Sequence, residues 1–98
     1  MEVIFEWDEK KSKRNVKAHG VSFEEAQTSF NDDLGLWMHA ESHSKDEDRF
    51  ILIGTSINFR KLVVVHCYRE KADKEIIRII SARKANKSES KQYKENLP

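Results

Sequence analysis

The sequence is poor in the residues that build disulfide scaffolds, flexible loops and membrane spans. It contains one cysteine, one proline and three glycines in 98 residues. The single Cys67 excludes an internal disulfide, and no pair of cysteines offers a zinc-ribbon spacing. Apolar runs such as Leu62–Val65 are far shorter than the roughly 18 residues of a membrane span, and no basic segment leads into an apolar run at the N-terminus. We therefore expect a cytoplasmic protein with one domain over residues 1–98.

Charge is nearly balanced in total but segregated along the chain. The 18 basic and 17 acidic residues give a net charge of +1. Asp8–Lys17 holds five basic and two acidic residues, Phe23–Asp33 holds four acidic and no basic residues, and Arg60–Lys71 is basic again. Such segregation can create a basic face for a polyanion and an acidic face for a different partner. Ordinary solvated faces are the alternative interpretation.

The N-terminal third predicts a short strand and two helices. Val3–Trp7 suits a strand, after which Asp8 can cap a helix that closes at Gly20. This first helix has little apolar surface, so it should lie shallowly on the body and expose its basic side chains. Ser22–Glu25 has the pattern of a capping box, and the second helix that it starts should end near residues 31–33.

The remaining chain alternates in the manner of strands. Strands are predicted over residues 34–39, 49–56, 61–69 and 75–83, separated by polar or turn-forming segments, and a short helix can start at Asn86. The predicted fold class is α+β: an antiparallel-rich sheet with a short N-terminal strand, two helices, a four-strand meander and a C-terminal helix. The two N-terminal helices should cover one face and leave part of the other face concave.

Metal and thiol chemistry find little support. His39 and His43 are four residues apart, but this stretch reads as a strand running into a loop, so we expect no metal site and no cofactor. His66 and Cys67 are consecutive in a strand and therefore point to opposite faces, which prevents a catalytic dyad in a regular strand. Cys67 is expected in the core.

The remaining candidate group is cationic. Arg49, His66 and Arg78 lie on three strands that should be neighbours, and Glu47 is close to Arg49 in sequence. Arginines could stabilise the charge that builds on a phosphodiester in the transition state, and Glu47, His66 or a lysine could transfer protons. Arg78 and Arg83 are five residues apart, so a regular strand would turn them to opposite faces. Surface arginines in ordinary salt bridges are the alternative.

Several sequence blocks, in order, resemble the BrnT toxin family. The resemblance covers nearly the whole chain, and it rests on the blocks Phe5–Asp8, Asn15–Ala26, His43–Arg49, Ile53–Gly54 and Arg78–Ala85. It implies a RelE-like fold and a ribonuclease toxin of a type II toxin–antitoxin pair. Toxins of this kind are held inactive by an antitoxin, here a BrnA-like ribbon-helix-helix protein that also binds operator DNA. Cleavage would proceed without metal, by attack of the ribose 2′-hydroxyl on the adjacent phosphate, and would inhibit translation and growth. The substrate would be free RNA or RNA on the ribosome.

The resemblance also assigns site residues by motif position. Many relatives have Asp-Pro where this chain has Asp32-Asp33, and a Thr is common where Cys67 stands. A non-catalytic module that binds RNA or a partner protein is the alternative function. The expected catalytic residues are Glu47, Arg49, His66, Arg78 and Arg83, and the expected RNA-binding residues are Lys17 and His19.

Overall fold

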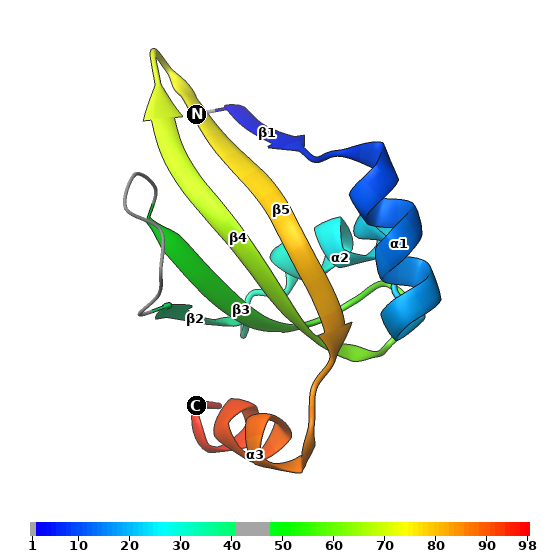
Figure 1. The fold of residues 1–98 in the computed structure, drawn as a ribbon. Coiled ribbons are helices and arrows are strands. Elements are labelled where there is room, and N and C mark those ends of the chain that lie inside the picture. The colour runs from blue at the N-terminus through cyan, green and yellow to red at the C-terminus, as the bar shows by residue number, and fades with distance from the viewer. Residues whose placement is uncertain (1, 41–47) are drawn as a thin grey trace.

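The computed structural model describes residues 2–40 and 48–98 as a curved sheet with helices around it (Figure 1). The elements follow one another in this order: β1 (Glu2–Glu6), α1 (Glu9–His19), α2 (Phe23–Thr28), the 3₁₀ turn η1 (Ser29–Asn31), β2 (Leu36–His39), β3 (Arg49–Thr55), β4 (Lys61–Lys71), β5 (Lys74–Lys84) and α3 (Lys87–Glu95). The predicted order of strands and helices is therefore confirmed.

The sheet is mixed rather than purely antiparallel. Its strand order is β1-β5-β4-β3-β2, so the last four strands form the predicted antiparallel meander. The first strand instead pairs in parallel with β5, with Glu6 opposite Arg78. This parallel contact sets where α1 begins relative to β5.

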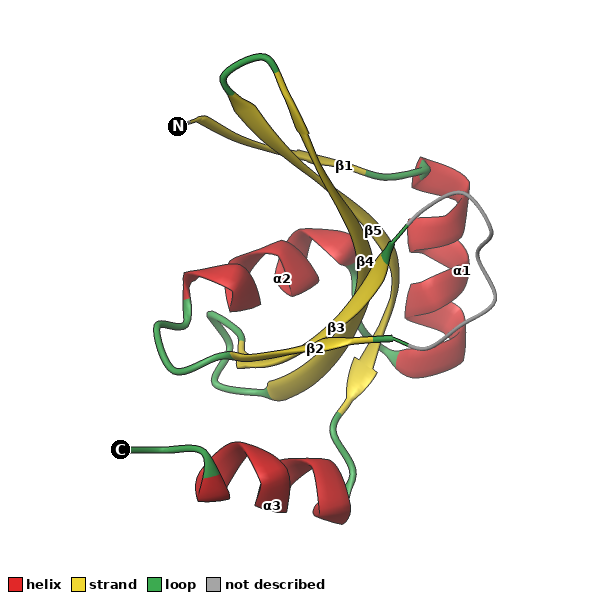
Figure 2. Cartoon of the chain, turned by 90° about the vertical axis from the view of Figure 1, so that its left-hand side faces the viewer, coloured by secondary structure: helices red, strands yellow, loops and turns green. Residues whose placement is uncertain are grey.

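The two faces of the sheet carry different cover. On one face, α2 and the segment before it bury Val21, Phe23 and Ala26 against Leu52 and Val64 of the sheet. The opposite face packs a smaller cluster around the Tyr93 ring of α3. Figure 2 shows the sheet between α2 on one side and α1 on the other, with α3 beyond one end. A large part of the second face therefore stays uncovered.

Helix α1 lies beside the edge of β5 instead of on the same face as α2. Its buried side chains are polar, Ser12 and Asn15, whereas Val16 is 45% exposed. The Asn15 amide donates to the carbonyl oxygens of Val21 and Ala82 and accepts from the Ala82 backbone N–H. Because β1 pairs with β5 only up to Arg78, these bonds satisfy the edge of β5 beyond it. The prediction that both helices cover one face was wrong for this reason.

A bulge in β5 changes which side chains share a face. The pairing of β4 with β5 shifts by one residue between Val65 and His66, which leaves Ile80 as the extra residue of β5. Ile79 and Ala82 consequently belong to the same core cluster although they are three residues apart.

The same shift places two arginines of β5 on one face of the sheet. Arg78 pairs with Cys67, and Arg83 pairs with Val63, which belongs to the cluster under α3. Both arginines therefore lie on the face opposite α2, with Arg83 beside α3 and Arg78 on the part that no described helix covers. The expectation that they point to opposite faces assumed a regular strand and was wrong.

Helix ends follow the capping signals, with one exception. Asp8, Ser22 and Asn86 each accept hydrogen bonds from backbone N–H groups of the following turn, and Gly20 has the left-handed φ of +70° that ends α1. At α2 the capping box is only half formed, because the Glu25 carboxylate turns inward to Ser56 and Arg60.

Candidate active site

Three neighbouring strands place two arginines in one row of the uncovered face. The register pairs Arg49 of β3 with Cys67 of β4, and Cys67 with Arg78 of β5. Two strand spacings, about 10 Å, separate the Cα atoms of the two arginines. Their side chains are long enough to reach one phosphate group between them.

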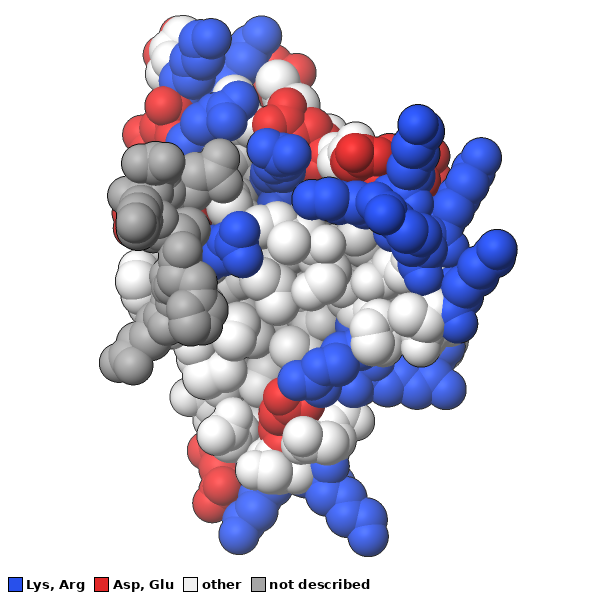
Figure 3. All heavy atoms as spheres, in the orientation of Figure 1, with Lys and Arg blue, Asp and Glu red and all other residues white. Residues whose placement is uncertain are grey.

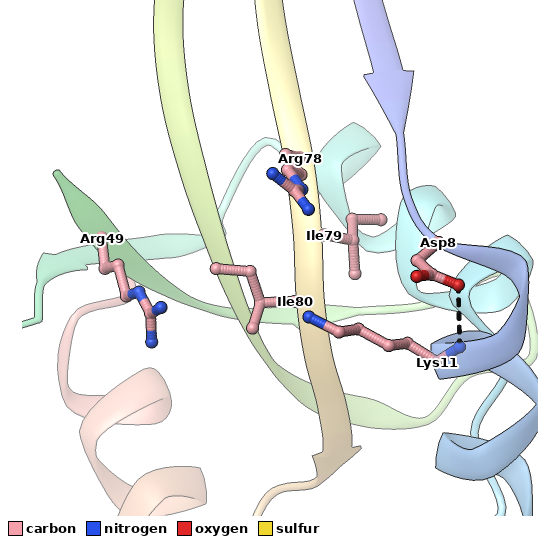
Figure 4. A pocket seen from close by; sticks show the side chains of 6 residues that line it. All are labelled: Asp8, Lys11, Arg49, Arg78, Ile79 and Ile80. Atoms are coloured by element: carbon pink, nitrogen blue, oxygen red, sulfur yellow. Dashed lines mark hydrogen bonds between the residues drawn. The ribbon is translucent and has the colours of Figure 1, made fainter. Parts of the chain in front are cut away.

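A small cavity of about 90 Å³ lies between these arginines and the start of α1. Figure 4 shows Arg49 on β3, Arg78 and Ile80 on β5, and the Lys11 side chain extending from α1 toward β5. The lining consists of three cations, one carboxylate and two isoleucines: Asp8, Lys11, Arg49, Arg78, Ile79 and Ile80.

None of these three cations forms an ion pair among residues 2–40 and 48–98. Arg60, Arg69 and Arg83 each form an ion pair in this part of the chain, whereas Arg49 and Arg78 form none. The Arg49 Nε atom is buried and has no hydrogen-bond partner among the same residues. Guanidinium groups left unpaired in this way are available to an anion.

The carboxylate of the cavity comes from the residue that caps α1. Asp8 accepts hydrogen bonds from the backbone N–H groups of Lys10 and Lys11, and these bonds lower its pKa below the ordinary value. Asp8 is therefore ionised at neutral pH. A more open hollow continues from the cavity past Glu6, Trp7, Asp8 and Arg78. Anionic groups thus stand at one side of a cationic centre.

The wider surface has the same character. In Figure 3 an uncharged central area of the sheet face is bordered by lysine and arginine side chains, most densely over α1. An uncharged floor with a cationic border suits a polyanion whose bases or sugars lie on the sheet and whose phosphates face the border.

Arg83 shares the face but is engaged elsewhere. Its guanidinium donates to both carboxylate oxygens of Glu89 in α3, at 2.7 Å each, and these bonds raise the pKa of Arg83. The same Glu89 completes the capping box of α3 by accepting from the Asn86 backbone N–H. Arg83 does not line the cavity, so the pair of arginines that the fold brings together is Arg49 with Arg78.

His66 lies on the other face of the sheet. Its side chain is fully buried, with ring centroids 4.5 Å from Trp37 and 4.8 Å from Phe30. Burial lowers the pKa of His66 to about 4, while the hydrogen bond to the Val64 carbonyl opposes this shift. The structure therefore separates His66 from the arginines, which leaves no role for it in proton transfer at the cavity. Cys67, which points to the arginine side, is buried as expected.

The other expected residues lie outside the cavity. Glu47 is outside the described residues, and so is His43. Lys17 and His19 are exposed in the last turn of α1. Lys11, in the first turn of the same helix, lines the cavity instead.

Lys11 and Asp8 were missed as site residues because their positions depend on the parallel pairing of β1. Glu6 pairs with Arg78, so the residues that follow β1 lie close to Arg78. The sequence shows that α1 is basic. It does not show the register of β1 against β5, which decides that Lys11, among five basic residues, lines the cavity.

Within the described part of the chain, no three His, Cys, Asp or Glu side chains are grouped so as to hold a metal ion. None of the helices in this part has the length and apolar character needed to cross a membrane.

Comparison with protein families identifies the class. Residues 7–89 match the family described as "Ribonuclease toxin, BrnT, of type II toxin-antitoxin system". A comparison with curated proteins finds no match. The fold and its cationic cavity thus belong to a ribonuclease toxin that is paired with an antitoxin. The chain belongs to the BrnT family, which favours the enzyme over the non-catalytic module.

Proposed function

We propose that this chain is a metal-independent endoribonuclease whose active site is the cavity between Arg49, Arg78 and Lys11. The reaction is attack of a ribose 2′-hydroxyl on the adjacent phosphorus, with departure of the 5′-oxygen and formation of a 2′,3′-cyclic phosphate. The observation that carries the proposal is the Arg49–Cys67–Arg78 row, which places two guanidinium groups without acidic partners among the described residues on either side of one cavity.

The cations would act on the phosphate. Negative charge builds on the nonbridging oxygens as the hydroxyl attacks, and fixed guanidinium groups stabilise this charge more in the transition state than in the ground state. Arg49 and Arg78 can each present two N–H groups to phosphate oxygens. Lys11, from the opposite wall, supplies the third positive charge.

Carboxylates would hold the nucleophile. The ionised Asp8 lines the same cavity and can accept a hydrogen bond from the attacking 2′-hydroxyl. Glu47 stays a predicted proton acceptor on the basis of its motif position. Lys17 and His19, further along α1, are predicted to bind the RNA chain beyond the scissile phosphate.

The partner would be a BrnA-like ribbon-helix-helix antitoxin that also binds operator DNA. The family match supports an antitoxin, because type II toxins are defined by a protein partner that neutralises them. Free toxin would degrade RNA, inhibit translation and arrest growth. A neighbouring gene for a short ribbon-helix-helix protein would support this assignment.

Cleavage of a short RNA by the purified chain tests the mechanism. With a chelator present, the RNA should still be cut and should end in a 2′,3′-cyclic phosphate. The same oligonucleotide with a single 2′-deoxy sugar at the cleaved position should resist cleavage there, because the nucleophile is missing. Strict dependence on an added divalent metal, or cleavage at the deoxy position, would contradict the proposal.

A further inference from the structure

The turn between β3 and β4 exposes two large apolar side chains at its tip. Phe59 is 92% exposed and Ile57 is 70% exposed, the two highest values among the exposed large hydrophobic residues described. Phe59 also has a left-handed backbone, with φ +60°. The turn lies at the far end of β3 from Arg49, about 20 Å along the strand.

Phenylalanine suits neither the backbone nor the solvent at this position. Residues 57–59 form a three-residue hairpin loop, since Ser56 donates its N–H to the Arg60 carbonyl. The third residue of such loops is usually a left-handed glycine, because a side chain adds steric strain there. An exposed ring recovers none of this cost by burial. A phenylalanine that is unfavourable both for the backbone and for exposure to water points to an interaction that the isolated chain does not make.

The turn is held rigidly in place from beneath. The Glu25 carboxylate accepts from the Ser56 hydroxyl at 2.7 Å and pairs with the Arg60 guanidinium, which also donates to the Gly20 carbonyl. The Ile57 backbone N–H donates to the Thr28 hydroxyl at 2.9 Å. A turn whose backbone is held before binding loses little backbone conformational entropy when a partner covers it.

The hollow beside the two side chains carries one carboxylate. It is lined by Asp32 together with uncharged residues, and no cation lines it. Burial alone would raise the pKa of Asp32, but hydrogen bonds from Tyr93, Thr55 and Leu34 together hold it below the ordinary value. Asp33, which follows Asp32, and Glu24 of α2 are exposed. Of the two cations after the turn, Arg60 is paired with Glu25, and Lys61 lies over the Tyr93 ring at 4.6 Å.

We propose that Ile57 and Phe59 form the docking site for the antitoxin, which covers them with an apolar pocket flanked by lysine or arginine. RNA does not fit this surface, because the surface carries the Asp32 carboxylate and lies far from the cationic cavity. A basic protein segment complements both its charge and its apolar tip. This inference rests on the proposed toxin function, and it separates the residues that bind antitoxin from those that cut RNA.

Replacement of Phe59→Gly provides the sharpest test, because glycine relieves the backbone while it removes the ring. Binding of the antitoxin encoded beside this chain should be measured by calorimetry with the full chain. Phe59→Gly should weaken binding at least tenfold, keep RNA cleavage within twofold of the unchanged chain and leave the thermal midpoint equal or higher. Phe59→Trp should retain binding, and Val3→Ala, an apolar residue exposed on β1, serves as the matched control.

Four results would overturn the inference. They are unchanged affinity in Phe59→Gly, loss of affinity in Val3→Ala alone, loss of RNA cleavage in Phe59→Gly, and self-association of the free chain that Phe59→Gly abolishes. The last result would assign the surface to a second copy. Absence of RNA cleavage in the unchanged chain would instead contradict the proposed function, and it would not alter the comparison of affinities.

Discussion

At the scale of single residues, the consecutive residues His66 and Cys67 of β4 point to opposite faces of the sheet and meet different environments. His66 faces an aromatic enclosure of Trp37, Phe30 and Phe50, while Cys67 lies in the arginine row of the other face. The Nε2 atom of His66 is buried and has no hydrogen-bond partner among the described residues. A histidine in such a place is kept neutral, because a charged ring would lose its hydration without gaining a partner.

This environment predicts a pH dependence of stability. His66 stays neutral in the folded chain down to about pH 4, whereas an unperturbed histidine binds a proton near pH 6.5. The unfolded chain therefore takes up more protons between these values, and the free energy of unfolding should fall by about 3 kcal/mol as the pH drops from 6.5 to 4. Below pH 4 this contribution should level off.

Chemical denaturation at a series of pH values measures this effect. His66→Leu should make the free energy of unfolding nearly independent of pH above about pH 4.5, where the carboxylates contribute less. His19→Ala, at an exposed position, is the control and should keep the pH dependence. An unchanged pH dependence in His66→Leu would show that the histidine is not the group that titrates.

At the scale of elements, regular patterns were predictable and their interruptions were not. Alternation located the four strands of the meander, and Asp8 and Gly20 located both ends of α1. The bulge at Ile80 left no signal of this kind, because every residue from Ile76 to Ile80 except Arg78 is isoleucine and fits either face. Arg49 and Arg78 could therefore be predicted as site residues from the sequence, but which arginines lie close together in space could not.

The face on which helix α1 lies was wrong for a related physical reason. This helix has little apolar surface, and it binds the sheet through Ser12 and Asn15. Only the short length of β1 makes this arrangement favourable, since it leaves backbone groups of β5 without a strand partner. Long-range pairing of this sort cannot be read from local periodicity.

Replacing Asn15 tests the attachment of α1. Asn15→Leu should lower the free energy of unfolding by about 3 kcal/mol, because the Val21 carbonyl and both Ala82 backbone groups lose their partner. Val16→Ala, at the neighbouring exposed position, should change it by less than about 0.5 kcal/mol. Urea unfolding with an unchanged m-value measures both, and equal small effects would contradict the role given to Asn15.

At the scale of the whole molecule, the sheet separates charges that the sequence had already grouped. The basic side chains of α1 border the uncovered face beside Arg49 and Arg78, and the acidic α2–η1 segment lies on the other side of the sheet. The two surfaces suit two different macromolecules. The proposed activity therefore requires that arginines from β3 and β5 act together on one phosphate.

A double-mutant cycle on RNA cleavage tests this claim most directly. Arg49→Ala and Arg78→Ala should each lower kcat/KM on the order of 100-fold, and Arg69→Ala, which removes an exposed ion pair with Glu6, should change it little. If both guanidinium groups stabilise one phosphate, the double variant should lose less than the product of the single losses, with a coupling of about 1 kcal/mol or more. Strictly multiplicative losses, or full activity in either single variant, would contradict the account.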